Sequence, residues 1–263
     1  MNKRYVFILF WLLIVFSPLY GEVNQSHSIV ASFLQLKEQY NLGTVFNGAQ
    51  LEYRYGLHWK IHDHEILYQP KLGFGIVFNN VMMGEEGGMK GYQANISPVN
   101  VSWIAPFPRN WPFYEHSGHA IKLGLNFAMN YSYQAYLDLH GGNMFWASEI
   151  GFSPIIQYQY QWNNKRIGIG LQNSLFGFTS HTQKKDLYFY HFFALNAPDW
   201  FKKPHEDMQL GSFNKYNHTN VSIEFSPNIQ KRHSFLYEFD FFSTFYGMQF
   251  KRMNHNIIWK VSV

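Results

Sequence analysis

The chain has 263 residues, of which 20% are aromatic and only 14% are charged, and its formal net charge is +4. Charged residues make up about a quarter of an ordinary soluble protein, so this composition is unusual for a soluble domain. The mean hydropathy of -0.26 nevertheless excludes a bundle of transmembrane helices. Because the chain has no cysteine, disulfides and thiolate metal sites are excluded as well. An apolar, aromatic shell around a polar interior is consistent with all of these values.

The N-terminal residues have the three parts of a secretory signal peptide. Lys3 and Arg4 form a basic start, residues 5–16 are an apolar core, and a turn-like stretch of small residues follows. We expect residues 1–21 to be removed, which leaves 22–263 as one barrel domain. A retained anchor helix is the alternative, but the apolar run is shorter than the roughly 20 residues that span a membrane. Without Lys3 and Arg4 the net charge is about +2, which is too small to indicate a nucleic-acid partner.

Nine later segments alternate apolar and polar residues, which places successive side chains on opposite faces of a β-strand. The clearest is 145–162, where Phe152 and Ile156 have one parity and Glu149 and Ser153 have the other. Strands of about nine to eleven residues with one apolar and one polar face are typical of membrane-spanning barrels. In chain order the nine segments are 51–60, 66–78, 92–105, 119–137, 145–162, 166–179, 219–226, 235–246 and 253–263.

A tenth strand is expected because bacterial single-chain barrels normally have an even number of strands. Asn163-Asn164 and residues 228–232 predict short turns at one end of the barrel. The long segment between these turns, including 187–195, is therefore expected to form a loop at the other end. We assign the tenth strand to 29–37, within a region (28–47) in which a short plug helix is the alternative.

The sequence thus predicts an all-β fold, a transmembrane antiparallel up-and-down β-barrel of about ten strands, with eight or twelve as alternatives. Within the segment 92–105 the apolar residues change parity at Pro98. Proline interrupts the hydrogen-bond ladder of a sheet, so we expect a β-bulge there.

The pattern resembles bacterial outer-membrane β-barrel proteins over about residues 48–263. Five tryptophans lie at or near predicted strand ends, where such proteins have aromatic girdles: Trp103, Trp111, Trp146, Trp162 and Trp259. The resemblance implies export to the outer membrane, contact with outer-membrane lipids, insertion by the barrel-assembly machinery and a monomeric state. In that family the last strand commonly ends in an aromatic residue, whereas this chain ends in Val263.

The polar face of the predicted strands carries charges of both signs, which we expect to lie in the lumen. A ten-stranded barrel is narrow, so the favoured interpretation is that these charges pair as salt bridges and fill it. The alternative is a small ion or solute pore, in which Glu224, Glu238 and Asp240 form an acidic cluster that attracts cations. The predicted lumen charges are Glu52, Arg54, Lys71, Lys122, Glu149, Glu224, Glu238, Asp240 and Lys260.

The thirteen histidines give no clear catalytic or metal motif. The pairs His62/His64 and His116/His119 lack a third ligand at suitable spacing, so we interpret them as loop histidines and expect no metal or cofactor. The enzymatic alternative is an outer-membrane lipid hydrolase of the lipid A deacylase or phospholipase type, which uses a serine activated by histidine. The H-x-S-N pattern of such enzymes is absent, and the nearest matches surround His218 and His181. The sequence therefore leaves an enzymatic activity open and favours none.

Overall fold

The structure is a computed structural model, and it describes residues 23–38, 45–79, 90–107, 118–136, 143–182, 202, 204–205, 208–212, 215–246 and 248–263. The predicted signal peptide (1–21) and the predicted outer-loop segment 187–195 lie outside the described residues. Both therefore stay predictions.

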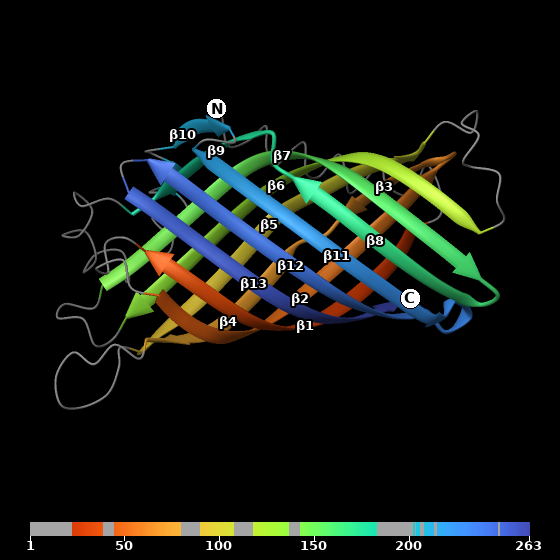
Figure 1. Ribbon diagram of the computed structural model, residues 1–263, viewed down its shortest axis with the longest axis horizontal. Coiled ribbons are helices and arrows are strands. Elements are labelled where there is room, and N and C mark those ends of the chain that lie inside the picture. Colours follow the sequence, from red (N-terminus) through yellow and green to blue (C-terminus); the bar gives the residue numbers. More distant parts are fainter. Residues whose placement is uncertain are drawn as a thin grey trace.

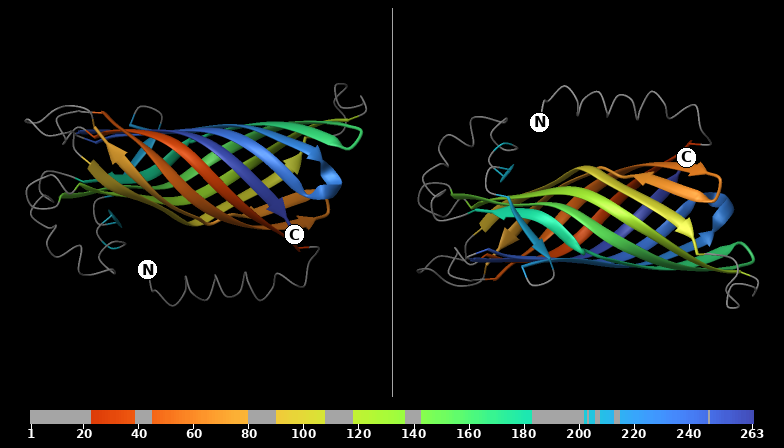
Figure 2. Two further views of the ribbon diagram at one scale, coloured as in Figure 1. Left: turned by 90° about the horizontal axis from the view of Figure 1, so that it is seen from below. Right: turned by 90° about the horizontal axis from the view of Figure 1, so that it is seen from above.

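The described strands close into one antiparallel barrel of ten strands, as the sequence predicts (Figure 1). Neighbours along the chain pair with each other, and the first strand, β1, pairs with the last, β13, to close the ring (Figure 2). The strands are β1 (Val23–Glu38), β2 (Val45–Ile61), β3 (His64–Tyr68), β4 (Lys71–Phe78), β5 (Lys90–Pro106), β6 (His119–Tyr136), β7 (Asn143–Trp162), β8 (Lys165–Asn173), β9 (Phe176–His181), β10 (Gln209–Ser212), β11 (Tyr216–Asn228), β12 (His233–Tyr246) and β13 (Met248–Ser262).

Two of the ten barrel strands are interrupted, which explains why the chain has more strands than the barrel. The strands β3 and β4 both lie between β2 and β5, and they are separated only at Gln69 and Pro70. The strands β8 and β9 both pair with β7 and are separated at Ser174 and Leu175. The four-residue β10 pairs with β9.

The β-bulge predicted at Pro98 is confirmed. The register between β5 and β6 shifts between Ile96 and Val99, and the Tyr68 hydroxyl donates to the carbonyl oxygen of Pro98 at 2.9 Å. Because the bulge adds one residue to β5, the outward face passes from Ile96 to Val99 without turning the strand over.

The N-terminal segment forms the tenth strand, and the alternative of a plug helix is wrong. Strand β1 pairs with β2 on one side and with β13 on the other, so a helix here would leave both edges open. The serines Ser26, Ser28 and Ser32 are buried inside the barrel, whereas Ile29 and Phe33 are exposed on its outer face.

The two faces of the barrel have the polarity of a transmembrane barrel. Leu51 and Ile257, on the outer face, are 67% and 68% exposed. Gln93, Asn126 and Ser153, on the inner face, are buried. A soluble protein has the opposite arrangement, whereas an apolar outside and a polar inside suit lipid surroundings. Among the described residues no helix is long and apolar enough to cross a membrane.

The two ends of the barrel differ. We call the end at which β1 begins and β13 ends the terminal end, and the opposite end the loop end. Tight turns with left-handed backbone at His62, Asn163 and Arg232 connect strands at the terminal end, including both turns that the sequence predicts. The connection from β9 to β11, which contains β10, lies at the loop end.

Candidate functional site in the lumen

Arg54 of β2 is the centre of an ion-pair group inside the lumen. Its two terminal nitrogens donate to both carboxylate oxygens of Glu238 of β12, at 3.0 and 2.7 Å. Its Nε donates to Glu52 at 2.5 Å, and Asn256 also donates to Glu238, at 2.8 Å. A two-pronged bond between a guanidinium and a carboxylate is among the strongest polar contacts in proteins, so this group ties together two wall strands, β2 and β12, that are separated by β1 and β13.

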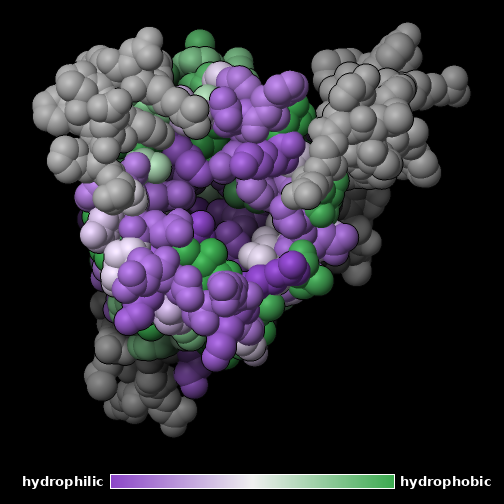
Figure 3. All heavy atoms as spheres, turned by 90° about the vertical axis from the view of Figure 1, so that its right-hand side faces the viewer, coloured by the Kyte–Doolittle hydropathy of each residue, from purple (hydrophilic) through white to green (hydrophobic). Residues whose placement is uncertain are grey.

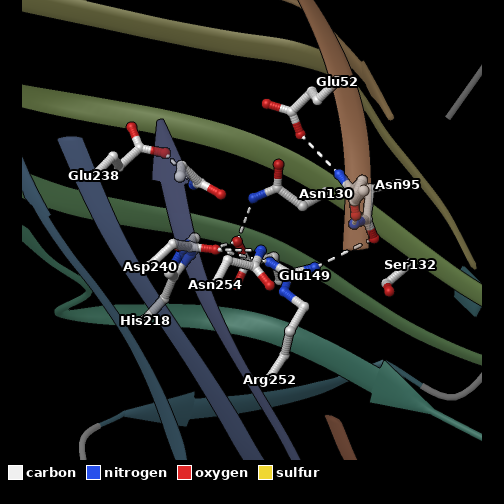
Figure 4. Close-up of polar contacts among 12 residues, drawn as sticks. Glu52, Asn95, Asn130, Ser132, Glu149, His218, Glu238, Asp240, Arg252 and Asn254 are labelled. Atoms are coloured by element: carbon white, nitrogen blue, oxygen red, sulfur yellow. Dashed lines mark hydrogen bonds and ion pairs between the residues drawn. The ribbon is translucent and has the colours of Figure 1, made fainter. Parts of the chain in front are cut away.

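A second group surrounds His218 of β11. The two ring nitrogens lie 2.6 Å from a Glu149 oxygen and 2.6 Å from an Asp240 oxygen. Both nitrogens can donate to these carboxylates at the same time when the ring is an imidazolium. Arg252 donates to the second oxygen of Asp240 at 3.2 Å, and Asn130 donates to Glu149. Figure 4 shows these side chains pointing toward one another across the lumen.

The two groups are electrically balanced. Four acidic residues lie near four basic ones when His218 is counted as charged. All of these residues except Glu149 line a polar cavity of about 50 Å³. A water molecule occupies about 10–15 Å³ on this measure, so the cavity has room for a few waters and no larger solute. The acidic residues are Glu52, Glu149, Glu238 and Asp240, and the basic residues are Arg54, Lys71, His218 and Arg252.

Apolar side chains fill the lumen between this network and the loop end. Phe46, Phe250 and Tyr216 are buried in one cluster contributed by strands from around the barrel. Phe242 lies in the same cluster and also contacts the Arg252 guanidinium, 5.7 Å from the ring centroid. The inward position of Phe242 breaks the polar parity of β12 because the lumen here is an apolar core.

The terminal end of the lumen holds separate ion pairs. Lys122 donates to Glu65 at 2.7 Å, and Arg166 lies 3.4 Å from Glu224, with Lys260 also close enough to act on Glu224. Figure 3 looks at this end and shows a central recess lined by hydrophilic residues. The acidic cluster proposed from the sequence is not formed: Glu224 belongs to this end, whereas Glu238 and Asp240 lie deeper and are each paired with a base.

The alternating pattern placed the nine predicted charges but missed several of their partners. The predicted site did not include Arg252 and Glu65, although both have inward parity on their strands. His218 was considered only as a hydrolase candidate. Asparagines that complete the network, Asn95, Asn130 and Asn256, also have inward parity. Counting every polar inward residue, and not only the charged ones, would have found them.

The geometry of the two candidate histidines does not favour a hydrolase. A general base needs a free ring nitrogen to accept a proton from serine, whereas both nitrogens of His218 contact carboxylates. His181 is buried near the loop end, where its Nδ1 lies 3.0 Å from the carbonyl oxygen of Thr182. The hydrolase alternative stays a prediction. No group of three or more metal-binding side chains is found among the described residues.

One patch of the outer wall near the loop end is buried instead of exposed. The connection between β9 and β10 packs against it: Ser180 donates to the carbonyl oxygen of Pro204 at 2.5 Å, and the Tyr131 hydroxyl lies 2.7 Å from Nε2 of His205. Partial burial against this wall lowers the pKa of His205 below its ordinary value. The other buried residues of the patch are Tyr133, Trp146, Ser148 and Thr182.

No protein-family model and no curated protein matches the sequence. Among solved structures, the translocator domain of the autotransporter NalP from Neisseria meningitidis aligns with a TM-score of 0.44 and 6% identity, covering 98% of this chain and 95% of that one. The β domain of the Bordetella autotransporter BrkA aligns with a TM-score of 0.42 and 8% identity, covering 92% and 99%. Neisserial surface protein A aligns with a TM-score of 0.33 and 10% identity, also covering 92% and 99%. These alignments are loose, so the fold assignment depends on the strand pairing of the barrel itself.

Proposed function

We propose that this protein is an integral outer-membrane β-barrel protein with a sealed lumen, and that its role is structural. The observation that carries this proposal is the filling of the lumen. A balanced network of charges crosses its middle, an apolar cluster fills the part next to the loop end, and a cavity of about 50 Å³ remains within the network. A diffusion pore needs a continuous water path, which requires a much larger open section.

The proposed location is supported by the architecture. The barrel has an even number of strands, both described ends of the chain lie at one end, and tight turns join strands there. This is the usual topology of bacterial outer-membrane barrels, in which the short turns face the periplasm. The predicted signal peptide agrees with export, and the barrel-assembly machinery would insert the chain. We expect a monomer, since β1 pairs with β13 and closes the barrel, which leaves few strand edges to pair with another copy.

Planar-bilayer recordings test the proposal. Purified protein should migrate faster on a gel before heating than after, because the folded barrel resists denaturation by detergent. The same preparation should add no steady conductance to the bilayer. A protein that remains in the soluble fraction without detergent would refute the membrane location, and an open channel of steady conductance would refute the sealed lumen.

A small ion pore is the second candidate, and the polar cavity in the network is the observation that favours it. Its lining includes Glu238 and Asp240 beside Arg54 and Arg252. If the protein conducts, replacing both Glu238 and Asp240 with alanine should change the ion preference of the current, because charged rings select ions in narrow pores. Conductance that is present in the wild type and unaffected by this double replacement would show that ions pass elsewhere.

A further inference from the structure

Four histidines lie at the terminal end of the barrel on its outer face, each against an aromatic side chain of a neighbouring strand. They begin or nearly begin four different barrel strands, β1, β3, β6 and β12. We interpreted His64 and His119 as loop histidines, although His119 also begins the predicted strand 119–137, and both are the first residues of strands. We call His27, His64, His119 and His233 with their aromatic partners the histidine girdle.

The ring contacts of the girdle repeat around the barrel. The His119 ring stacks on Tyr160 with centroids 4.5 Å apart, and the His64 ring stacks on Trp103 at 5.4 Å. The His233 ring is nearly parallel to Trp259 at 6.0 Å. His27 lies 5.5 Å from the Tyr55 ring. Trp103 and Trp259 are both about half exposed, so the girdle lies at the surface and not in a core.

Two of the histidines are also oriented by tyrosine hydroxyls. The Tyr53 hydroxyl lies 2.6 Å from Nδ1 of His27, and the Tyr158 hydroxyl lies 2.6 Å from Nδ1 of His119. When the hydroxyl donates to Nδ1, the neutral imidazole carries its proton on Nε2. Each of these rings then has an N–H donor available to an acceptor outside the protein.

The rim of the same end is basic. Among the described residues, the exposed charged side chains next to the turns are Lys60, Lys165, Lys231 and Arg232 on the positive side and Asp63 on the negative side. Figure 3 shows hydrophilic residues surrounding the opening at this end. A ring of N–H donors bordered by an excess of positive charge is complementary to phosphate oxygens.

We propose that the histidine girdle and its basic rim bind the headgroups of anionic phospholipids. The aromatic rings lie at the depth where amphipathic side chains favour the membrane interface. The imidazole N–H groups and the rim cations then contact the phosphates of the leaflet at the terminal end. This inference rests on the proposed membrane location of the barrel, and it adds a lipid preference that an aromatic girdle alone would not produce.

Brominated lipids measure this preference, because bromine quenches the fluorescence of nearby tryptophans such as Trp103 and Trp259. The barrel is refolded into phosphatidylcholine vesicles containing brominated phosphatidylglycerol or brominated phosphatidylcholine. For the wild type we expect phosphatidylglycerol to bind about fivefold more tightly, since one basic group near an anionic surface contributes on the order of 1 kcal/mol.

A quadruple variant and a matched control locate the effect. Changing the four girdle histidines to phenylalanine, which keeps a ring but removes the N–H donor, should clearly lower the preference, and the part that remains is due to the rim cations. The control is His255→Phe: His255 makes the same kind of contact, 2.7 Å from the Tyr237 hydroxyl and 5.2 Å from the Phe239 ring, but lies in the middle of β13. It should keep the full preference. If the quadruple variant does not fold, the four single variants should each lower the preference by a part of the total.

Three outcomes overturn the inference. The wild type shows no preference for phosphatidylglycerol, the quadruple variant keeps the full preference, or the His255 control loses it as well. A preference lost only when Lys165, Lys231 and Arg232 become glutamine would assign it to the rim and remove the histidines from the site. Failure of the wild type to insert into phosphatidylcholine vesicles at all would instead contradict the proposed function, so the two failures are distinguishable.

Discussion

Replacing Arg54 with methionine should strongly destabilise the barrel. The Arg54 side chain is 6% exposed and makes three charged hydrogen bonds, two to Glu238 and one to Glu52. Removing it leaves two buried carboxylates facing each other, with Lys71 as the remaining cation of this group close enough to act on Glu238. Loss of one partner of a buried ion pair costs roughly 3–5 kcal/mol, and the second carboxylate places the expected value toward the upper part of that range.

Two companion variants test whether the ion pair is the cause. Glu238→Gln keeps a hydrogen-bond acceptor for Arg54 and leaves the bond to Glu52 intact, so we expect a loss of only about 1–2 kcal/mol. The double variant Arg54→Met/Glu238→Gln should be less destabilised than the sum of the two, because the Glu238→Gln change removes one of the two facing charges. Arg166→Met is the matched control: its partner Glu224 lies 3.4 Å away and the two side chains are 34% and 21% exposed, so we expect less than about 1 kcal/mol.

The assay is unfolding by urea in lipid vesicles, followed by the gel shift between folded and unfolded forms. The reasoning is refuted if Arg54→Met lies within about 0.5 kcal/mol of the wild type, which is the range of a neutral surface substitution. An equal loss in Arg54→Met and Arg166→Met would also refute it, because it would show that burial does not set the strength of these pairs.

Three further changes have definite expected outcomes. Gly151→Ala should destabilise the barrel because an alanine Cβ would overlap the Tyr216 hydroxyl. Adding Tyr216→Phe to this variant should restore stability, because the nearest remaining ring atom would lie at an ordinary 3.5 Å. Urea midpoints of the single and double variants that fail to show this rescue would contradict the packing. Phe46→Ala should lower the free energy of unfolding by about 3–5 kcal/mol, because Phe46 is buried in the core of the lumen. Phe74→Ala should lower it clearly less, because Phe74 is exposed on the outer face. Equal urea midpoints of the two variants would contradict the apolar filling of the lumen. The contact of His205 with the outer wall should be complete above a pH of about 6.5, the ordinary pKa of histidine, and should weaken as the pH falls below that value. The reason is that the pKa of His205 is lowered in the folded protein, so the detached segment binds the proton more readily. Hydrogen exchange of this connection that does not depend on pH, or that keeps its pH dependence in His205→Gln, would rule this out.

The period of two in the sequence determined the face of each residue, and this was enough to predict the barrel. It placed Glu52 and Arg54 on the inside and Leu51 and Tyr53 on the outside, because the alternation of a strand is fixed by its backbone. Even the slip at Pro98 could be predicted, since proline cannot donate to the ladder.

The partners of the inward residues could not be predicted from the same pattern. Alternation gives the face of a residue but neither its height along the barrel axis nor its position around the ring. Arg54 and Glu238 are 184 residues apart and meet only because the strands tilt and the barrel closes between β1 and β13. Glu224, which precedes Glu238 on the neighbouring strand, has the same inward parity but lies nearer the terminal end, with Arg166.

The unequal filling of the lumen explains why its polar residues are arranged as they are. Among the described residues, apolar side chains such as Phe46 and Phe250 lie between the loop end and the network. Toward the terminal end the ion pairs become more exposed, from Arg54 and Glu238 in the middle to Arg166 and Glu224 near the opening. Charges far from water need complete pairing within the protein, whereas charges near the opening are partly hydrated. The two-pronged bond of Arg54 and the doubly bound His218 therefore occur deep in the barrel, and the more exposed pairs, such as Arg166 with Glu224, occur where solvent can partly hydrate them.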